Sequence, residues 1–205
     1  MVIPTGEPER RLASFRAAES VMESLLPNIS DWFKDKEIWF RTFAKHDSRV
    51  EGWFKGEMLV CLEHLKDQGC IEGFDREFTI GKKGWGEKGQ LKIDLRVRNN
   101  GQNHLCELKA MCISRASGTS RDLNFYFRPN QDVGLVKDFK KLASLQTQDA
   151  LWILSFVYPS PSTEDWNRAL GKWQEVITPW ACMTDPSSYP NWCFLGCWQL
   201  HKNPS

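Results

Sequence analysis

The sequence lacks several patterns by which whole classes of protein are recognised. It has no run of 18 apolar residues, so we expect no transmembrane helix and no membrane partner. Its seven cysteines form no CxxC pair and its four histidines form no HExxH motif, which disfavours a zinc site and favours reduced, buried thiols. Residues 1–11 contain no basic region followed by an apolar stretch, as a secretory signal requires. These absences predict a cytoplasmic protein.

The sequence also has little net charge. Its 27 Lys and Arg residues nearly balance 26 Asp and Glu residues, so any contact with nucleic acid must come from a local basic patch. Hydrophobic residues make up 41% and charged residues 26%, values typical of a globular chain. No internal repeat or long linker is present. With 205 residues, the chain can form one well-buried core, and we predict a single domain over residues 1–205.

Hydrophobic periodicity predicts the order of helices and strands. Spacings of three and four residues predict helices over residues 9–26, 51–67, 136–145 and 162–176. Alternation and apolar runs predict strands over residues 74–80, 91–98, 104–112, 150–158 and 192–200. Residues 30–48 are rich in aromatics and fit either a helix or a strand. This order predicts an α/β domain with a mixed sheet, on which residues 1–48 pack as a helical and aromatic extension.

Two of the predicted strands alternate between an apolar and a polar face. In residues 91–98, the apolar face holds Leu91, Ile93, Leu95 and Val97. Asn100 and Gly101 follow this strand, and both tolerate the positive φ angles of a two-residue hairpin turn. That turn places Ile93 opposite Leu108 on the apolar face and Asp94 opposite Glu107 on the polar face. Opposed carboxylates repel each other, but they are also the oxygen ligands that a hard divalent cation needs.

Two further charged side chains join these carboxylates. Lys109 lies two residues after Glu107, so it points to the same polar face and could hold or polarise a water molecule beside a metal ion. On a helical wheel of residues 51–67, Glu57 flanks the buried direction at about 80°, from where its carboxylate could reach the sheet. The sequence therefore predicts a site of four residues: Glu57, Asp94, Glu107 and Lys109.

The spacing of these residues resembles a known signature. Asp94, followed after twelve residues by Glu107-Leu108-Lys109, resembles the motif of the PD-(D/E)xK nuclease superfamily, the fold of many restriction endonucleases. The order helix, three strands, helix, strand over residues 50–158 is similar to the core of that superfamily. Ile93 stands where the proline of the motif would be. This difference bears on the subfamily that the chain resembles more than on the activity that the resemblance implies. The resemblance implies a restriction-endonuclease-like fold with an αβββαβ core.

The resemblance also implies an activity, namely a hydrolase that cleaves phosphodiester bonds with Mg²⁺, or with Mn²⁺ in its place. Asp94 and Glu107 would bind the ion, with the backbone carbonyl of Leu108 as a further ligand and Glu57 as a supporting group. Lys109 would orient the attacking water. The expected substrate is DNA. Because the sequence contains no recognisable specificity domain, helicase or methyltransferase segment, we expect the enzyme to act with partner proteins, or as a homodimer if it makes double-strand breaks.

Local basic segments favour a nucleic-acid partner. Residues 81–98 hold six basic residues against two acidic ones, and their glycine-rich part is flexible enough to follow a phosphate backbone. Three lysines on the predicted helix 136–145 add contacts to phosphates. The predicted nucleic-acid-binding residues are Lys82, Lys83, Trp85, Lys88, Lys137, Lys140 and Lys141.

Other interpretations of the same residues stay open. The chain could keep the fold as a catalytically silent nucleic-acid-binding or scaffold protein. The four-residue site could also be a solvated sheet face, on which Lys92, Arg96 and Lys109 neutralise the two carboxylates. The same residues could also cleave RNA instead of DNA.

Overall fold

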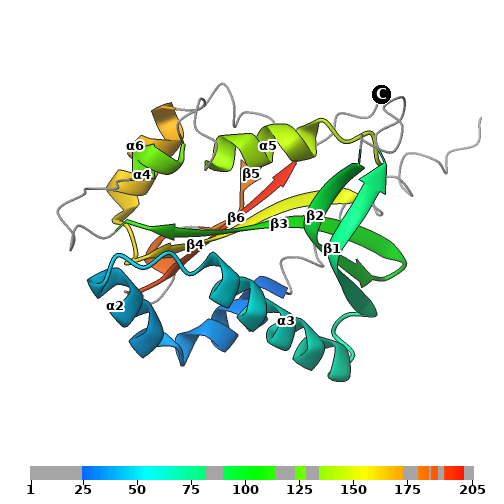
Figure 1. The fold of residues 1–205 in the computed structure, drawn as a ribbon, viewed down its shortest axis with the longest axis horizontal. Helices are drawn as coiled ribbons and strands as arrows, with labels where there is room; N and C mark the ends of the chain where they lie inside the picture. The colour runs from blue at the N-terminus through cyan, green and yellow to red at the C-terminus, as the bar shows by residue number, and fades with distance from the viewer. Residues whose placement is uncertain are drawn as a thin grey trace, which may run out of the picture.

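The computed structural model describes residues 25–81, 90–113, 123–127, 134–172, 180–184, 186–188 and 192–200. Within these ranges, the strands form a six-stranded sheet of order β1-β2-β3-β4-β6-β5 (Figure 1). β3 and β4 are parallel, whereas the other neighbouring strands are antiparallel. The fold is therefore mixed α/β, with helices on both faces of a mixed sheet, as the sequence predicted.

Most elements follow the predicted periodicities, but the helix over residues 123–126 and the strand over residues 180–182 are not predicted by the sequence. The helices are α2 (Glu37–Lys45), α3 (Glu51–Asp67), α4 (Leu123–Tyr126), α5 (Leu135–Ala143) and α6 (Thr163–Lys172). The strands are β1 (Gly73–Gly81), β2 (Gln90–Asn99), β3 (Gln102–Cys112), β4 (Ala150–Tyr158), β5 (Trp180–Cys182) and β6 (Phe194–Leu200), with a 3₁₀ turn at Pro186–Ser188. Residues 25–34 are also helical, so the ambiguous aromatic stretch forms helices, whereas the predicted helix 9–26 lies almost entirely outside the described residues.

The two faces of the sheet carry separate apolar cores. Residues 25–34, α2 and α3 cover one face, and α4, α5 and α6 cover the other (Figure 1). On the α3 face, the ring of Phe156 contacts those of Phe54 and Phe33, with centroids 4.0 and 4.3 Å apart. On the opposite face, Trp198 and Trp166 are fully buried, with centroids 5.4 Å apart. No described helix is long and apolar enough to span a membrane.

The hairpin between β2 and β3 has the predicted turn. Asn100 and Gly101 have φ angles of 49° and 69°, the left-handed region that a two-residue turn of this kind needs. The paired residues run from Asn99 with Gln102 to Leu95 with Cys106, which is the predicted register. The Asn-Gly dipeptide therefore fixes which residues of the two strands meet.

At Asp94, however, β2 changes the face to which its apolar side chains point. Leu95 packs in the core on the α3 face, whereas Ile93 packs in the core on the α5 face. The pairing of β1 with β2 skips Glu77, which has a φ of 51°, and the pairing of β2 with β3 ends at Leu95. The predictions that Ile93 shares a face with Leu95 and lies opposite Leu108 are therefore wrong. The predicted pairing of Asp94 with Glu107 is likewise absent, because the pairing of β2 with β3 stops one residue before it. Alternation along a strand cannot reveal where the strand leaves its neighbour.

Candidate functional site

Charged side chains gather at the point where β2 leaves β3. From Glu107 to Cys112, β3 pairs with β4, and α3 and α5 approach β3 from opposite faces (Figure 1). We call the seven charged side chains that meet here the polar cluster: Glu51 and Lys55 of α3, Asp94 of β2, Glu107 and Lys109 of β3, and Asp138 and Lys141 of α5. Segments that lie far apart in the sequence therefore build one site.

Asp94 is held by both β3 and α3. Its Oδ2 accepts a hydrogen bond of 2.9 Å from the backbone N–H of Leu108, and its Oδ1 accepts one of 2.7 Å from Lys55. Lys55 also lies 3.1 Å from Glu51. Burial alone lowers the pKa of Lys55, but the charges and hydrogen bonds of Asp94 and Glu51 outweigh it and raise that pKa. Lys55 therefore stays charged and fixes the Asp94 carboxylate beside β3.

Glu107 is the most buried acid of the polar cluster. Its residue surface is 5% exposed, and its Oε1 accepts a bond of 2.5 Å from Lys141. Burial raises the pKa of Glu107 to about 7; the bond to Lys141 opposes this shift, and the nearby charge of Asp94 adds to it. One lysine therefore does not compensate the cost of burying this carboxylate, and Glu107 is poised to gain or lose a proton near neutral pH.

Lys109 lies between two carboxylates. Its Nζ is 3.6 Å from Glu51 and 3.6 Å from Asp138, and its side chain is 15% exposed. At this distance the contacts are ion pairs rather than hydrogen bonds, so the ammonium group keeps donors for another oxygen atom. Burial raises the pKa of Asp138, although Lys109 and Lys141 oppose the shift. Lys109 therefore places a cation beside Asp138, a carboxyl group that holds its proton more tightly than an exposed aspartate does.

The structure does not bring Glu57 to the polar cluster. Its Oε2 accepts a hydrogen bond of 3.3 Å from the indole of Trp32 and lies 2.8 Å from Lys36. The expectation that Glu57 reaches the sheet site is therefore wrong, and Glu51 is the carboxylate that α3 supplies. The wheel could have shown this, because at about 100° per residue Glu51 lies about 40° from the buried direction. However, a helical wheel gives only the direction in which a side chain points, and not its position along the helix axis.

The other predicted residues are placed as follows. Leu108 presents its N–H to Asp94, and the structure shows no role for its carbonyl. Lys141 bonds to Glu107, whereas Lys137 and Lys140 are exposed on the same helix. Lys82, Lys83, Trp85 and Lys88 lie outside the described residues.

The nearby basic residues of β2 do not neutralise Asp94. Lys92 pairs with Glu77 at 3.2 Å, and Arg96 pairs with Asp75 at 2.6 Å. The interpretation as a solvated sheet face is therefore wrong on this point. The cations that do neutralise the carboxylates, Lys55 and Lys141, come from the helices. No pattern in the sequence indicates Lys55 or Asp138, because their positions depend on how α3 and α5 pack against the sheet.

The donor atoms of the polar cluster suit a hard divalent cation. Four carboxylates face three lysines, so the polar cluster carries one excess negative charge when all four carboxylates are ionised. No three His, Cys, Asp or Glu residues of the described part lie close enough together to hold a metal by themselves. Mg²⁺, however, is usually bound through one or two carboxylates and keeps several water molecules or phosphate oxygens as its other ligands. Asp94 and Glu107 fit that requirement.

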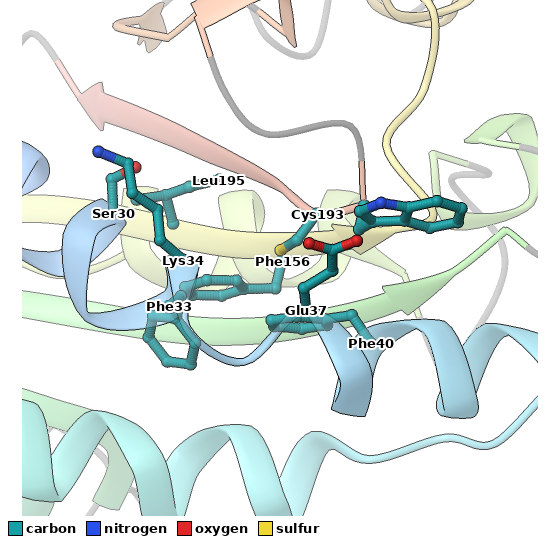
Figure 2. A pocket seen from close by; sticks show the side chains of 9 residues that line it. Ser30, Phe33, Lys34, Glu37, Phe40, Phe156, Cys193 and Leu195 are labelled. Carbon is teal, nitrogen blue, oxygen red and sulfur yellow. The ribbon is translucent and has the colours of Figure 1, made fainter.

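A separate pocket lies on the other side of α2 from α3, and Glu37 supplies the one carboxylate among its described lining residues (Figure 2). The rings of Phe33, Phe40 and Phe156 form one side of it. Burial raises the pKa of the Cys193 thiol well above its usual range, so this thiol is not a ready nucleophile. Glu37, which also lines the pocket, pairs with Arg41 at 2.8 Å. Within the described part of the chain, this pocket therefore offers neither a ready nucleophile nor an unpaired carboxylate.

Fold and site together define an α/β protein with buried carboxylates and a lysine gathered at a break between two strands. No protein-family model, curated protein or solved structure matches this chain. The functional argument therefore rests on the residues of the polar cluster.

Proposed function

We propose that this chain is a metal-dependent nuclease that hydrolyses phosphodiester bonds, with DNA as its substrate. The observation that carries the proposal is the bond from the backbone N–H of Leu108, between buried Glu107 and Lys109, to Asp94, where the pairing of β2 with β3 ends. Two acidic oxygen donors beside a lysine are what phosphodiester hydrolysis with Mg²⁺ or Mn²⁺ requires.

The order of elements supports a restriction-endonuclease-like fold. α3, β1, β2, β3, α5 and β4 follow one another as the PD-(D/E)xK resemblance implies, apart from the short α4 between β3 and α5. β3 and β4 lie side by side and parallel, with α5 in the connection between them. The resemblance thus extends from the motif to the arrangement of the elements that carry it.

Each residue of the polar cluster then has a chemical role. Asp94 and Glu107 would hold the ion, which supplies positive charge to stabilise the phosphate during the reaction. Lys55 and the N–H of Leu108 keep Asp94 in place. Lys109 donates to a phosphate oxygen or to the attacking water, because its ion pairs leave donors available. Glu51 takes the supporting role that the sequence had suggested for Glu57.

Asp138 is the side chain that we assign to proton transfer. Its carboxylate lies 3.6 Å from Lys109, so a water molecule oriented by Lys109 is also within its reach. Burial raises the pKa of Asp138, and a carboxylate with a raised pKa is a better base near neutral pH. Asp138 would take a proton from the attacking water while Lys109 stabilises the charge that develops on the phosphate.

A specific observation favours a second candidate, a nucleic-acid-binding or scaffold protein without catalysis. Lys55 and Lys141 bond directly to Asp94 and Glu107, the two carboxylates that would bind the ion. If those lysines serve only to neutralise the carboxylates, the polar cluster is a structural ion-pair network. The two candidates differ in whether a divalent cation binds.

Titration with Mn²⁺ and Mg²⁺, followed by calorimetry and tryptophan fluorescence, tests the proposal. A nuclease should bind the ion saturably, and Asp94→Asn should abolish the binding without unfolding the protein. Glu63→Gln is the matched control, because Glu63 is an exposed carboxylate of α3 that pairs with Lys66. Absence of saturable binding to the unchanged protein would favour the scaffold. Equal binding of the ion by Asp94→Asn and by the unchanged protein would show that the ion binds at another site.

A further inference from the structure

A cleft adjoins the polar cluster, between α3 and the strands β1 and β2. Its volume is about 170 Å³, and it is lined by Gly52, Lys55, Gly56, Leu59, Arg76, Glu77, Asp94, Leu95 and Leu108. Lys55 and Asp94 belong to both the cleft and the polar cluster. A molecule with one group bound at the cluster therefore has its neighbouring part beside or inside the cleft.

The lining of the cleft suits a neutral group with polar edges. Leu59, Leu95 and Leu108 form an apolar part, and the other side chains are charged. The cations of Lys55 and Arg76 are balanced by the carboxylates of Asp94 and Glu77. A phosphate is bound by an excess of cations, which this cleft does not offer. A flat heterocycle instead buries its faces on apolar side chains and bonds to charged groups at its edges.

The size of the cleft limits what can enter it. At about 170 Å³, it is smaller than the roughly 300–1,000 Å³ of a site for a drug-sized molecule. It therefore has room for one ring system and not for a base pair.

Two helical glycines keep the cleft open. Gly52 and Gly56 lie one turn apart on the side of α3 that lines the cleft, and a Cβ atom added at either would meet no atom within 4 Å. Packing within the described chain therefore does not require glycine at either position. Glycine also weakens a helix relative to alanine. A side chain longer than alanine at Gly56 would project into the space that the cleft offers to a ligand.

We propose that the cleft binds one unpaired nucleobase of the strand whose phosphate lies at the polar cluster. This inference rests on the proposed nuclease function, and it names the substrate class as single-stranded or frayed DNA. A base inside a duplex must leave the stack before it can enter such a cleft, which costs free energy that an unpaired strand does not lose. The base fixes the position of the neighbouring phosphate between Asp94 and Lys109.

Binding of two strands that differ only in their bases tests this inference. Fluorescence anisotropy would compare labelled oligothymidylate with an abasic strand of the same length, with Ca²⁺ in place of Mg²⁺ to prevent cleavage. The proteins are the unchanged chain, Gly56→Leu and Gly171→Leu. Gly171 is a matched control, because it lies in α6 and an added Cβ there also meets nothing within 4 Å. Thermal melting of all three proteins checks that they fold.

The unchanged chain should bind oligothymidylate about 10-fold more tightly than the abasic strand, because only the former has bases whose apolar faces the leucines of the cleft can bury. Gly56→Leu should lose this preference, and Gly171→Leu should keep it. Equal binding of both strands by the unchanged chain, or a full preference in folded Gly56→Leu, would overturn the inference. Cleavage of DNA with Mg²⁺, scored in parallel, separates the two proposals: cleavage without base preference overturns this inference alone. No cleavage and no binding would overturn both.

Discussion

At the scale of single residues, Glu107 gives the structure a pH dependence of known sign. Its pKa is raised from 4.5 to about 7, so between these values the folded state binds a proton that the unfolded state has lost. The free energy of unfolding should therefore fall as the pH rises through this window, by about 2 to 3 kcal/mol. Below pH 4.5, the contribution of Glu107 becomes constant, because both states are protonated.

Glu107→Gln removes this titration and leaves a side chain of nearly the same shape. Urea unfolding of both proteins at pH 5 and pH 8, in metal-free buffer, measures the difference. The unchanged chain should lose about 2 to 3 kcal/mol relative to the variant between the two values. An identical pH dependence of both proteins would show that Glu107 has an ordinary pKa in the folded state.

Two carboxylates of α3 provide a second comparison at this scale. Glu51 pairs with Lys55 and Lys109 in the polar cluster, whereas Glu57 pairs with Lys36. Glu51→Gln should lower Mg²⁺-supported cleavage by about 10- to 100-fold, the range expected for a group that positions catalytic residues. Glu57→Gln should leave cleavage nearly unchanged. Steady-state rates with a fluorescent DNA substrate measure both, and the reverse order of the two effects would contradict the assignment.

At the scale of the elements, the turn of the β2–β3 hairpin sets the pairing that ends at Leu95 and Cys106, the neighbours of Asp94 and Glu107. Gly101 has a φ of 69°, where an alanine side chain costs about 1–2 kcal/mol. Gly101→Ala should therefore lower the free energy of unfolding by about that amount. Gly171→Ala should instead raise it, by up to about 1 kcal/mol, because Gly171 is helical. Urea denaturation of both variants checks these opposite signs, and a loss of stability in Gly171→Ala would contradict the argument.

The same elements show what sequence periodicity can predict. The bounds of α3 and β4 follow from spacing alone, and the Asn-Gly turn predicts the pairing from Asn99 to Leu95. The change of face at Asp94 could not be predicted, because β2 continues to alternate in sequence while it leaves β3 in space. A local pattern reports the conformation of one strand and not its partner.

At the scale of the whole molecule, the polar cluster is a product of tertiary structure. The motif predicted Asp94, Glu107 and Lys109, and Asp94 bonds to the N–H of Leu108, the residue between the other two. Glu51 and Asp138 reach Lys109 from opposite faces of the sheet, and no spacing in the sequence links them. The motif thus marks the strand part of the site. The helix part depends on where α3 and α5 lie along the sheet.

The measurement that tests the central claim most directly is cleavage by the unchanged chain and by Lys109→Ala. Linear, circular and single-stranded DNA, and RNA, would each be incubated with Mg²⁺ or Mn²⁺. Lys66→Ala is the control, because Lys66 is an exposed lysine of α3 whose pairing with Glu63 adds little to stability. We expect cleavage of DNA by the unchanged chain and by Lys66→Ala, and none by folded Lys109→Ala with either ion. Cleavage that survives in Lys109→Ala, or no cleavage of any substrate by the unchanged chain, would contradict the account.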